Sequence, residues 1–194
     1  MKWTIPNILT LLRIILIPVL VVVFYMPGQW SYQISAVVFG LAAVTDWLDG
    51  YLARRWDQAS AFGAFLDPVA DKLMVAVALV LLVQDNPSPL FAVPAAIIIG
   101  REIAISALRE WMSEIGARTK VAVSIIGKIK TTIQMIAIVL LLYKLPLGQF
   151  PTHATGLTLL YIAAILTLWS MFVYLRAAWP ILSGAEGPSS KDDA

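Results

Sequence analysis

Two neighbouring stretches of this chain place four carboxylates within strongly apolar sequence. They read Asp46-Trp47-Leu48-Asp49-Gly50-Tyr51-Leu52-Ala53-Arg54 and Gly63-Ala64-Phe65-Leu66-Asp67-Pro68-Val69-Ala70-Asp71. The apolar sequence on both sides predicts helices that enter a lipid bilayer. A carboxylate at membrane depth is costly and therefore indicates a functional site. Four such groups would repel one another unless cations lie between them, which points to divalent metal.

The composition places the chain among integral membrane proteins. Its 194 residues are 60% hydrophobic and 13% charged, with a mean hydropathy of +0.83, whereas soluble domains carry roughly 25% charged residues. Cysteine is absent, which excludes disulfides and thiolate metal sites. The net charge of +2 does not suggest a nucleic-acid partner. The first apolar stretch follows Lys2 and is expected to be a retained helix, not a cleaved signal peptide.

Six segments are long and apolar enough to cross a bilayer as helices, since a span needs about 20 residues. They are Ile8–Tyr25, Gln33–Leu52, Phe65–Val83, Phe91–Trp111, Val121–Tyr143 and Gly156–Ala177. The sequence thus predicts an all-α membrane protein with one catalytic domain over residues 1–182. The polar tail, residues 183–194, is expected to be disordered.

Positive residues predict the orientation of these spans. Lysine and arginine gather at the start of the chain, after the second segment, between the fourth and fifth, and after the sixth, whereas the opposite loops hold only Lys144. Cytoplasmic loops carry the excess of such residues. Both termini should therefore be cytoplasmic, with the aspartates near the cytoplasmic end of the second and third spans.

The spacing of the aspartates fits a metal site. Asp46 and Asp49 are three positions apart, and Asp67 and Asp71 are four apart, so each pair shares one helical face. Oxygen donors suit Mg²⁺ or Mn²⁺, and two such ions about 4 Å apart can be bridged by a carboxylate set. Pro68 suits a first helical position directly after Asp67. Caps or packing groups are the simpler explanation for one aspartate, but not for four in paired spacing.

The two stretches spell D-x-x-D-G-x-x-A-R-x₈-G-x₃-D-x₃-D, which resembles the signature of the CDP-alcohol phosphatidyltransferase family. The resemblance extends over nearly the whole chain and implies that family's six-helix fold. Residues 5–13 are similar to its entry helix. Residues 101–111 and 127–132 are similar to bacterial members that transfer a phosphatidyl group from CDP-diacylglycerol to glycerol 3-phosphate and release CMP. It also implies an inner-membrane location and a homodimer.

The resemblance assigns roles to matching positions. It implies that Asp46, Asp49, Asp67 and Asp71 bind two divalent cations, Mg²⁺ or Mn²⁺, and that Asp71 is also the proton acceptor. It further implies that the cytidine nucleotide of CDP-diacylglycerol contacts Asn7, Thr10, Gly50, Ala53, Arg54, Ser60 and Gly63.

The acceptor phosphate needs cations, which arginine and lysine supply. The predicted ligands are Arg101, Arg109, Arg118 and Lys128, with Lys120 and Lys130 as further candidates. Each has a simpler alternative: Arg118 and Lys120 suit a topology signal, and Arg101 suits an ion pair with Glu102. Arg13 could bind a lipid phosphate or extend to the interface, and Lys72 could balance the acidic site. His153, the only histidine, falls on the other side of the membrane from the aspartates and is expected to have no catalytic role.

Two alternative functions remain open from the residues alone. A related transferase could use serine, an inositol phosphate or phosphatidylglycerol as acceptor. A divalent-cation transporter would also place aspartates in the membrane, but it would need polar residues through to the other face, and the first, fifth and sixth segments offer few.

Overall fold

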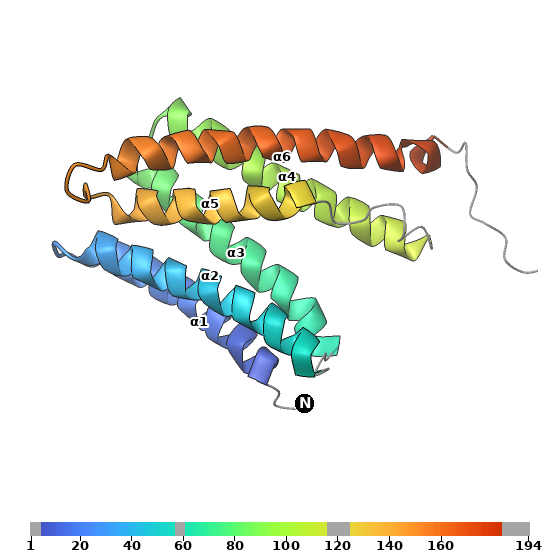
Figure 1. Cartoon of the computed structure of the whole chain (residues 1–194), viewed down its shortest axis with the longest axis horizontal. Helices are drawn as coiled ribbons and strands as arrows, with labels where there is room; N and C mark the ends of the chain where they lie inside the picture. The colour runs from blue at the N-terminus through green and yellow to red at the C-terminus, as the bar shows by residue number, and fades with distance from the viewer. Residues whose placement is uncertain (1–4, 57–60, 116–124, 184–194) are drawn as a thin grey trace, which may run out of the picture.

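Six helices make up the part of the chain that the computed structural model describes, residues 5–56, 61–115 and 125–183. Within it, side chains are described except those of residues 5, 6, 47, 49–56, 61, 62, 64, 125, 126, 128 and 181. The helices are α1 (Ile5–Tyr25), α2 (Ser31–Trp56), α3 (Ala61–Asp85), α4 (Pro89–Glu114), α5 (Ile125–Tyr143) and α6 (Thr152–Leu182) (Figure 1). The six predicted helical segments are confirmed, and all except α5 begin earlier than the hydropathy pattern suggested. The predicted tail lies outside the described residues, apart from Ser183.

One local prediction was wrong. Pro68 does not begin a helix after Asp67, because α3 already begins at Ala61 and Pro68 lies inside it. A proline at that depth removes one backbone hydrogen bond of the helix and bends it. Asp67 therefore lies within α3, directly before Pro68, and does not cap the start of the helix.

Three helices of the described part are long and apolar enough to cross a membrane. These stretches are Asn7–Tyr25, Pro89–Glu114 and Thr152–Pro180. They agree with the membrane character predicted from composition. Helices α2 and α3, which bear the aspartates, are more polar on average than α1.

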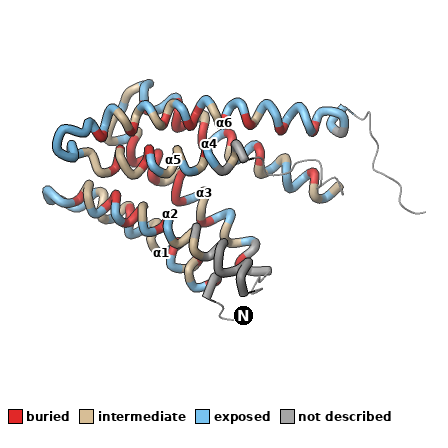
Figure 2. The backbone as a smooth tube through the Cα atoms, in the orientation of Figure 1, coloured by how far each residue is buried: buried red, intermediate tan, exposed pale blue. Residues whose placement is uncertain are grey.

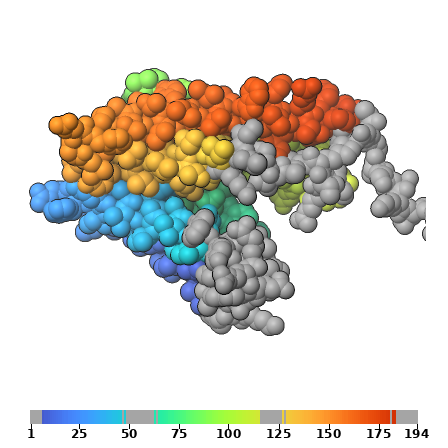
Figure 3. All heavy atoms as spheres, viewed as in Figure 1, coloured from blue at the N-terminus to red at the C-terminus, as the bar shows by residue number. Residues whose placement is uncertain are grey.

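The helices run back and forth between two ends of the molecule. Residues 26–30, 86–88 and 144–151 form the turns at one end, here called the turn end. The opposite end, called the linker end, is where α2 and α4 finish and α3 and α5 begin. Helix α1 packs along α2 and α3, while α6 packs along α5 and α4. The space-filling view shows α5 and α6 lying above α1 and α2 (Figure 3).

The core lies where these helix pairs meet. Its fully buried side chains include Leu20, Phe39, Leu79, Ile138 and Leu160, one from each of five helices. Large apolar side chains such as Val22, Phe65 and Trp169 point outward, and Figure 2 shows exposed positions along the outer face of every helix. An apolar exterior over a packed interior is the arrangement that a bilayer favours.

Helices α5 and α6 pack tightly at Gly156. A Cβ atom added there would lie 2.9 Å from Cγ of Leu141 and 3.2 Å from Cβ of Leu140. The missing side chain therefore allows the two backbones to pack at this distance, in the manner of small residues between membrane helices.

An ion pair joins two of the turns at the turn end. Nζ of Lys144 lies 2.8 Å from Oδ2 of Asp85 and 4.2 Å from the ring centroid of Tyr32. The Tyr32 hydroxyl donates to Oδ1 of Asp85 at 3.4 Å. We call Tyr32, Asp85 and Lys144 the Asp85 cluster. Lys144 has a φ of 62°, a conformation that costs a residue with a side chain roughly 1–2 kcal/mol and that ends α5.

Candidate active site

Three of the four signature aspartates have described side chains, and they lie on α2 and α3, toward the linker end. Asp46 is on α2, and Asp67 and Asp71 are one turn apart on α3. All three side chains are half-buried. The Asp46 carboxylate repels those of Asp67 and Asp71 electrostatically, so the three groups share one acidic region. This proximity is what the spacing of the sequence predicted for two antiparallel helices.

Helix α1 presents a polar face to these carboxylates. Asn7, Thr10 and Arg13 recur every three positions, and 2%, 0% and 1% of their surfaces are exposed. The Thr10 hydroxyl donates to Oδ1 of Asp67, and Nη1 of Arg13 lies 3.0 Å from Oδ1 of Asp46. The acidic region is therefore built from three helices and carries its own counter-charge.

Arg13 is a residue whose role the sequence left open between binding a lipid phosphate and extending to the membrane interface. Its side chain is 1% exposed and paired with Asp46, so it lies inside the acidic region. Its three-residue spacing from Thr10 and Asn7 on an otherwise apolar helix was the available signal, since such spacing gives one face.

Several predicted residues lie outside the described part. The side chains of Asp49, Ala53 and Arg54 and the surroundings of Gly50 are not described, and Ser60 falls between the described ranges. Gly63 is buried. The predicted nucleotide contacts are thus described only at Asn7, Thr10 and Gly63.

The acidic region suits a hard divalent cation by its donor chemistry. Carboxylate oxygens are the preferred ligands of Mg²⁺ and Mn²⁺, and the two positive charges of Arg13 and Lys72 do not balance the three carboxylates, of which Asp46 repels the other two. Among the side chains described, no three acidic or histidine groups converge on one point as a metal site. Two of the three carboxylates are engaged by α1, and Asp49, the fourth predicted ligand, is not among the described side chains.

Asp71 differs from its two acidic neighbours. Within the described ranges, no side chain is found to donate a hydrogen bond to its carboxylate, although Arg13 and Lys72 attract it electrostatically. Lys72 itself donates to the Ser106 hydroxyl on α4. Asp71 is therefore a half-buried carboxylate that the described cations attract.

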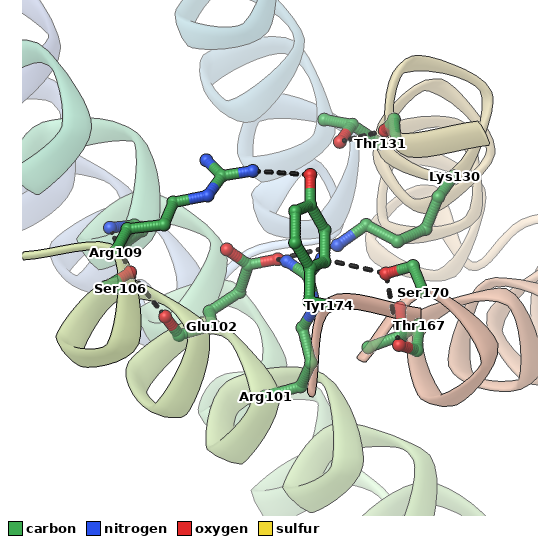
Figure 4. A network of polar contacts seen from close by, with 11 residues as sticks. Arg101, Glu102, Ser106, Arg109, Lys130, Thr131, Thr167, Ser170 and Tyr174 are labelled. Atoms are coloured by element: carbon green, nitrogen blue, oxygen red, sulfur yellow. Dashed lines mark hydrogen bonds and ion pairs between the residues drawn. The ribbon is translucent and has the colours of Figure 1, made fainter. Parts of the chain in front are cut away.

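A second polar region lies between α4, α5 and α6 (Figure 4). Oε1 of Glu102 on α4 lies 2.9 Å from Nη1 of Arg101 and 2.6 Å from Nζ of Lys130 on α5. Nη2 of Arg101 donates to the Ser170 hydroxyl on α6 at 2.8 Å. The Glu102 carboxylate also repels Asp71, so this region and the acidic region lie within electrostatic range of each other.

Tyr174 on α6 holds a further cation beside this network. Its hydroxyl accepts a hydrogen bond of 2.6 Å from Nη2 of Arg109, and its ring centroid lies 4.9 Å from Cζ of Arg109 and 5.7 Å from Cζ of Arg101. We call Arg101, Glu102, Arg109, Lys130, Ser170 and Tyr174 the Glu102 cluster.

The structure brings two of the four predicted phosphate ligands together and leaves two undescribed. Arg101 and Arg109 both belong to the Glu102 cluster, whereas Arg118 and the side chain of Lys128 are outside the described residues. The ion pair that the sequence offered as the simpler explanation for Arg101 is present. Lys130, a secondary candidate, is buried in the cluster, and Tyr174 was missed because it lies 65 positions from Arg109.

His153 lies at the turn end, near the start of α6. Its ring packs against that of Phe91 on α4, with the two ring centroids 5.7 Å apart. The expectation that His153 takes no part in catalysis remains a prediction.

Comparisons with known proteins agree with the signature in the sequence. A family model described as CDP-alcohol phosphatidyltransferase matches residues 3–173. A protein of Salmonella choleraesuis (strain SC-B67), named CDP-diacylglycerol--glycerol-3-phosphate 3-phosphatidyltransferase, is 56% identical over 178 residues, which cover 92% of this chain and 96% of that protein. The Escherichia coli (strain K12) protein of the same name is 55% identical with the same coverage.

Proposed function

Because the chain belongs to the CDP-alcohol phosphatidyltransferase family, we propose that it transfers the phosphatidyl group of CDP-diacylglycerol to sn-glycerol 3-phosphate. The products are phosphatidylglycerophosphate and CMP, so the enzyme serves phospholipid biosynthesis. The observation that carries this proposal is the 55–56% identity, over 92% of the chain, to relatives named for that reaction. Serine, an inositol phosphate and phosphatidylglycerol are less favoured as acceptors, because those relatives are named for glycerol 3-phosphate.

Two divalent cations would be held by Asp46, Asp49, Asp67 and Asp71. When bound, Mg²⁺ or Mn²⁺ would neutralise the diphosphate and stabilise the departing CMP. The mutual repulsion of the three described carboxylates supports this assignment, because a cation removes it. Arg13 and Thr10 hold Asp46 and Asp67 in place from α1.

Asp71 accepts the proton of the attacking hydroxyl. The primary hydroxyl oxygen of glycerol 3-phosphate forms a bond to the lipid-linked phosphorus, and the bond from that phosphorus to the CMP oxygen breaks. The proton passes from the hydroxyl to a carboxylate oxygen of Asp71, which serves as general base. The absence of a hydrogen-bond donor to Asp71 among the described residues supports this choice.

The nucleotide and the acceptor occupy different parts of the site. The cytidine nucleotide contacts Asn7, Thr10, Gly50, Ala53, Arg54, Ser60 and Gly63. The phosphate of the acceptor is held by Arg101, Arg109, Arg118 and Lys128, and Lys130 joins them because it lies beside Arg101 in the Glu102 cluster. The electrostatic contact between Glu102 and Asp71 supports a short path from this cluster to the base.

All six helices span the bacterial inner membrane, with both termini and the active site on the cytoplasmic side. The positive residues of the linker end support this orientation, and the water-soluble acceptor and CMP can then exchange with the cytoplasm. Residues 1–182 form the catalytic domain. The assembly is a homodimer, a proposal supported by the family resemblance and testable by crosslinking in native membranes.

Purified protein in detergent micelles containing CDP-diacylglycerol tests the reaction. CMP release should require both a divalent cation and glycerol 3-phosphate, and phosphatidylglycerophosphate should form in equal amount. Parallel assays with serine, inositol phosphate and phosphatidylglycerol should give no release above background. Preference for one of those acceptors would sink the proposal, as would cation uptake into proteoliposomes without any nucleotide.

A further inference from the structure

Two buried cations in the Glu102 cluster converge on a single carboxylate oxygen. Arg101 and Lys130 contact the same atom, Oε1 of Glu102, at 2.9 Å and 2.6 Å. The side chains of the two cations are 8% and 3% exposed, whereas that of Glu102 is 26% exposed. The carboxylate of Glu102 is thus the most exposed member of the trio. It can swing away from the two cations, whereas the buried side chains of Arg101 and Lys130 are held in place by their surroundings.

The cluster carries more positive charge than Glu102 can balance. Arg101, Arg109 and Lys130 give three positive charges around one carboxylate, and both arginines repel Lys130. Nε of Arg101 is a buried donor for which no acceptor is found among the described residues. Buried donors are normally paired, so the cluster retains both charge and hydrogen-bonding capacity for a second anion.

A phosphate monoester suits this place better than a carboxylate does. It presents three acceptor oxygens and close to two negative charges at neutral pH, whereas a carboxylate presents two oxygens and one charge. Tyr174 fixes the guanidinium of Arg109 beside the trio (Figure 4), so the donors are pre-positioned and little ordering is needed when an anion arrives.

We propose that Glu102 is a built-in competitor of the acceptor: its carboxylate occupies Arg101 and Lys130 until the phosphate of the acceptor displaces it. This inference rests on the proposed function, since it takes the Glu102 cluster as the acceptor site. If Arg101 and Lys130 are free of Glu102 in only a fraction of the molecules, the apparent affinity for the acceptor is reduced by that fraction. Glu102 therefore raises the acceptor concentration that is needed and rejects weaker anions, such as the carboxylate of serine, that cannot displace it.

Steady-state kinetics of Glu102→Gln tests the proposal. Glutamine keeps the shape and one acceptor oxygen of glutamate but not its charge. The KM for glycerol 3-phosphate and the inhibition constant of inorganic phosphate should both fall by about 3- to 10-fold. The reason is that the variant removes a negative charge that competes with the phosphate, and the attraction between two charges at close range is worth about 1 kcal/mol or more. The KM for CDP-diacylglycerol should not change. Asp85→Asn is the matched control. It removes the carboxylate that pairs with Lys144 at the turn end, away from the Glu102 cluster, and it should change none of these constants.

The opposite results are equally informative. A rise in the acceptor KM, no change in either constant, or an equal change for CDP-diacylglycerol would show that Glu102 only holds the helices together. If Glu102→Gln does not fold, Glu102→Asp, whose shorter side chain retracts the carboxylate, should lower both constants by a smaller factor, and no decrease would overturn the inference.

Thermal unfolding separates this inference from the proposed function. If glycerol 3-phosphate stimulates no CMP release even in the unmodified protein, the proposed reaction is wrong. Inorganic phosphate should still raise the unfolding temperature of Glu102→Gln more than that of the unmodified protein. An equal or smaller increase would overturn the role of Glu102 without any reference to turnover.

Discussion

The Glu102 cluster and the Asp85 cluster contain the same kind of ion pair but serve different purposes. Each pairs a lysine with a carboxylate on another helix, at 2.6 Å and 2.8 Å. Lys130 is 3% exposed and shares its carboxylate with an arginine, whereas Lys144 is 34% exposed and Asp85 has no second cation within the described residues. The first cluster is buried with excess positive charge, and the second is neutral and closes the turns. A buried cluster with excess charge therefore indicates a binding site for an ion of opposite charge, whereas a neutral ion pair is explained by its structural role.

The largest contrast should be between two aspartates of α3. Asp71→Asn removes the proposed general base, so turnover should fall about 100- to 10,000-fold, whereas Asp85→Asn at the other end of the same helix should keep its turnover. CMP release by both purified variants, with circular dichroism to confirm that they are folded, makes the measurement. Unimpaired turnover in Asp71→Asn would remove that residue from the mechanism.

The two lysines should differ next in stability. Lys130→Met leaves the partly buried carboxylate of Glu102 with Arg101 as its one remaining cation in the cluster and should lower the free energy of unfolding by about 1.5–3 kcal/mol. Lys144→Met breaks a more exposed pair and should cost about 1 kcal/mol or less. Unfolding in mixed micelles of increasing SDS content measures both. Similar losses for the two variants would contradict the distinction between the clusters.

The tight packing of α5 against α6 should contribute to the stability of the protein. Gly156→Ala places a Cβ atom 2.9 Å from Leu141, and overpacking of this kind costs about 1–3 kcal/mol. Gly40→Ala on α2 is the control, because no atom lies within 4 Å of its added Cβ and a helical alanine is favoured by about 0.5–1 kcal/mol. The unfolding temperatures in detergent should therefore move in opposite directions, and a shift in the same direction would argue against tight α5–α6 packing.

The smallest effect concerns pH. Burial lowers the pKa of Lys144, but its hydrogen bonds with Asp85 and Tyr32 outweigh burial and leave the pKa above the ordinary 10.5. A raised pKa gives stabilisation that is complete below the ordinary value and is lost only as pH rises through the higher one. The difference in unfolding temperature between the unmodified protein and Lys144→Met should hence stay constant from about pH 6 to about pH 9. A difference that shrinks within this range would show that the pair titrates earlier.

The sequence predicted the helices well, because hydropathy over about 20 residues is a strong local signal. It also predicted that the aspartates of α2 and α3 share a region, because helical spacing and a short connection determine that. The contacts between distant positions escaped it: Thr10 and Asp67 are 57 positions apart, and nothing local links Arg13 to Asp46 or Tyr174 to Arg109. Such pairs depend on how whole helices pack, which no single segment encodes.

The ion pair between Arg13 and Asp46 has a consequence for how the protein enters the membrane. Helix α1 is made first, and in the proposed six-span topology α2 brings Asp46, the first carboxylate of the signature, toward the bilayer soon after. A carboxylate within a membrane helix is costly to insert, and the arginine already present in α1 would offset part of that cost while the later helices are still being synthesised. Arg13→Leu should therefore reduce insertion of an α1–α2 hairpin in a translocation reporter, with Gly40→Ala on α2, where an added Cβ meets no atom within 4 Å, as a neutral control. In this respect the first helix would assist the insertion of the signature carboxylates that follow it.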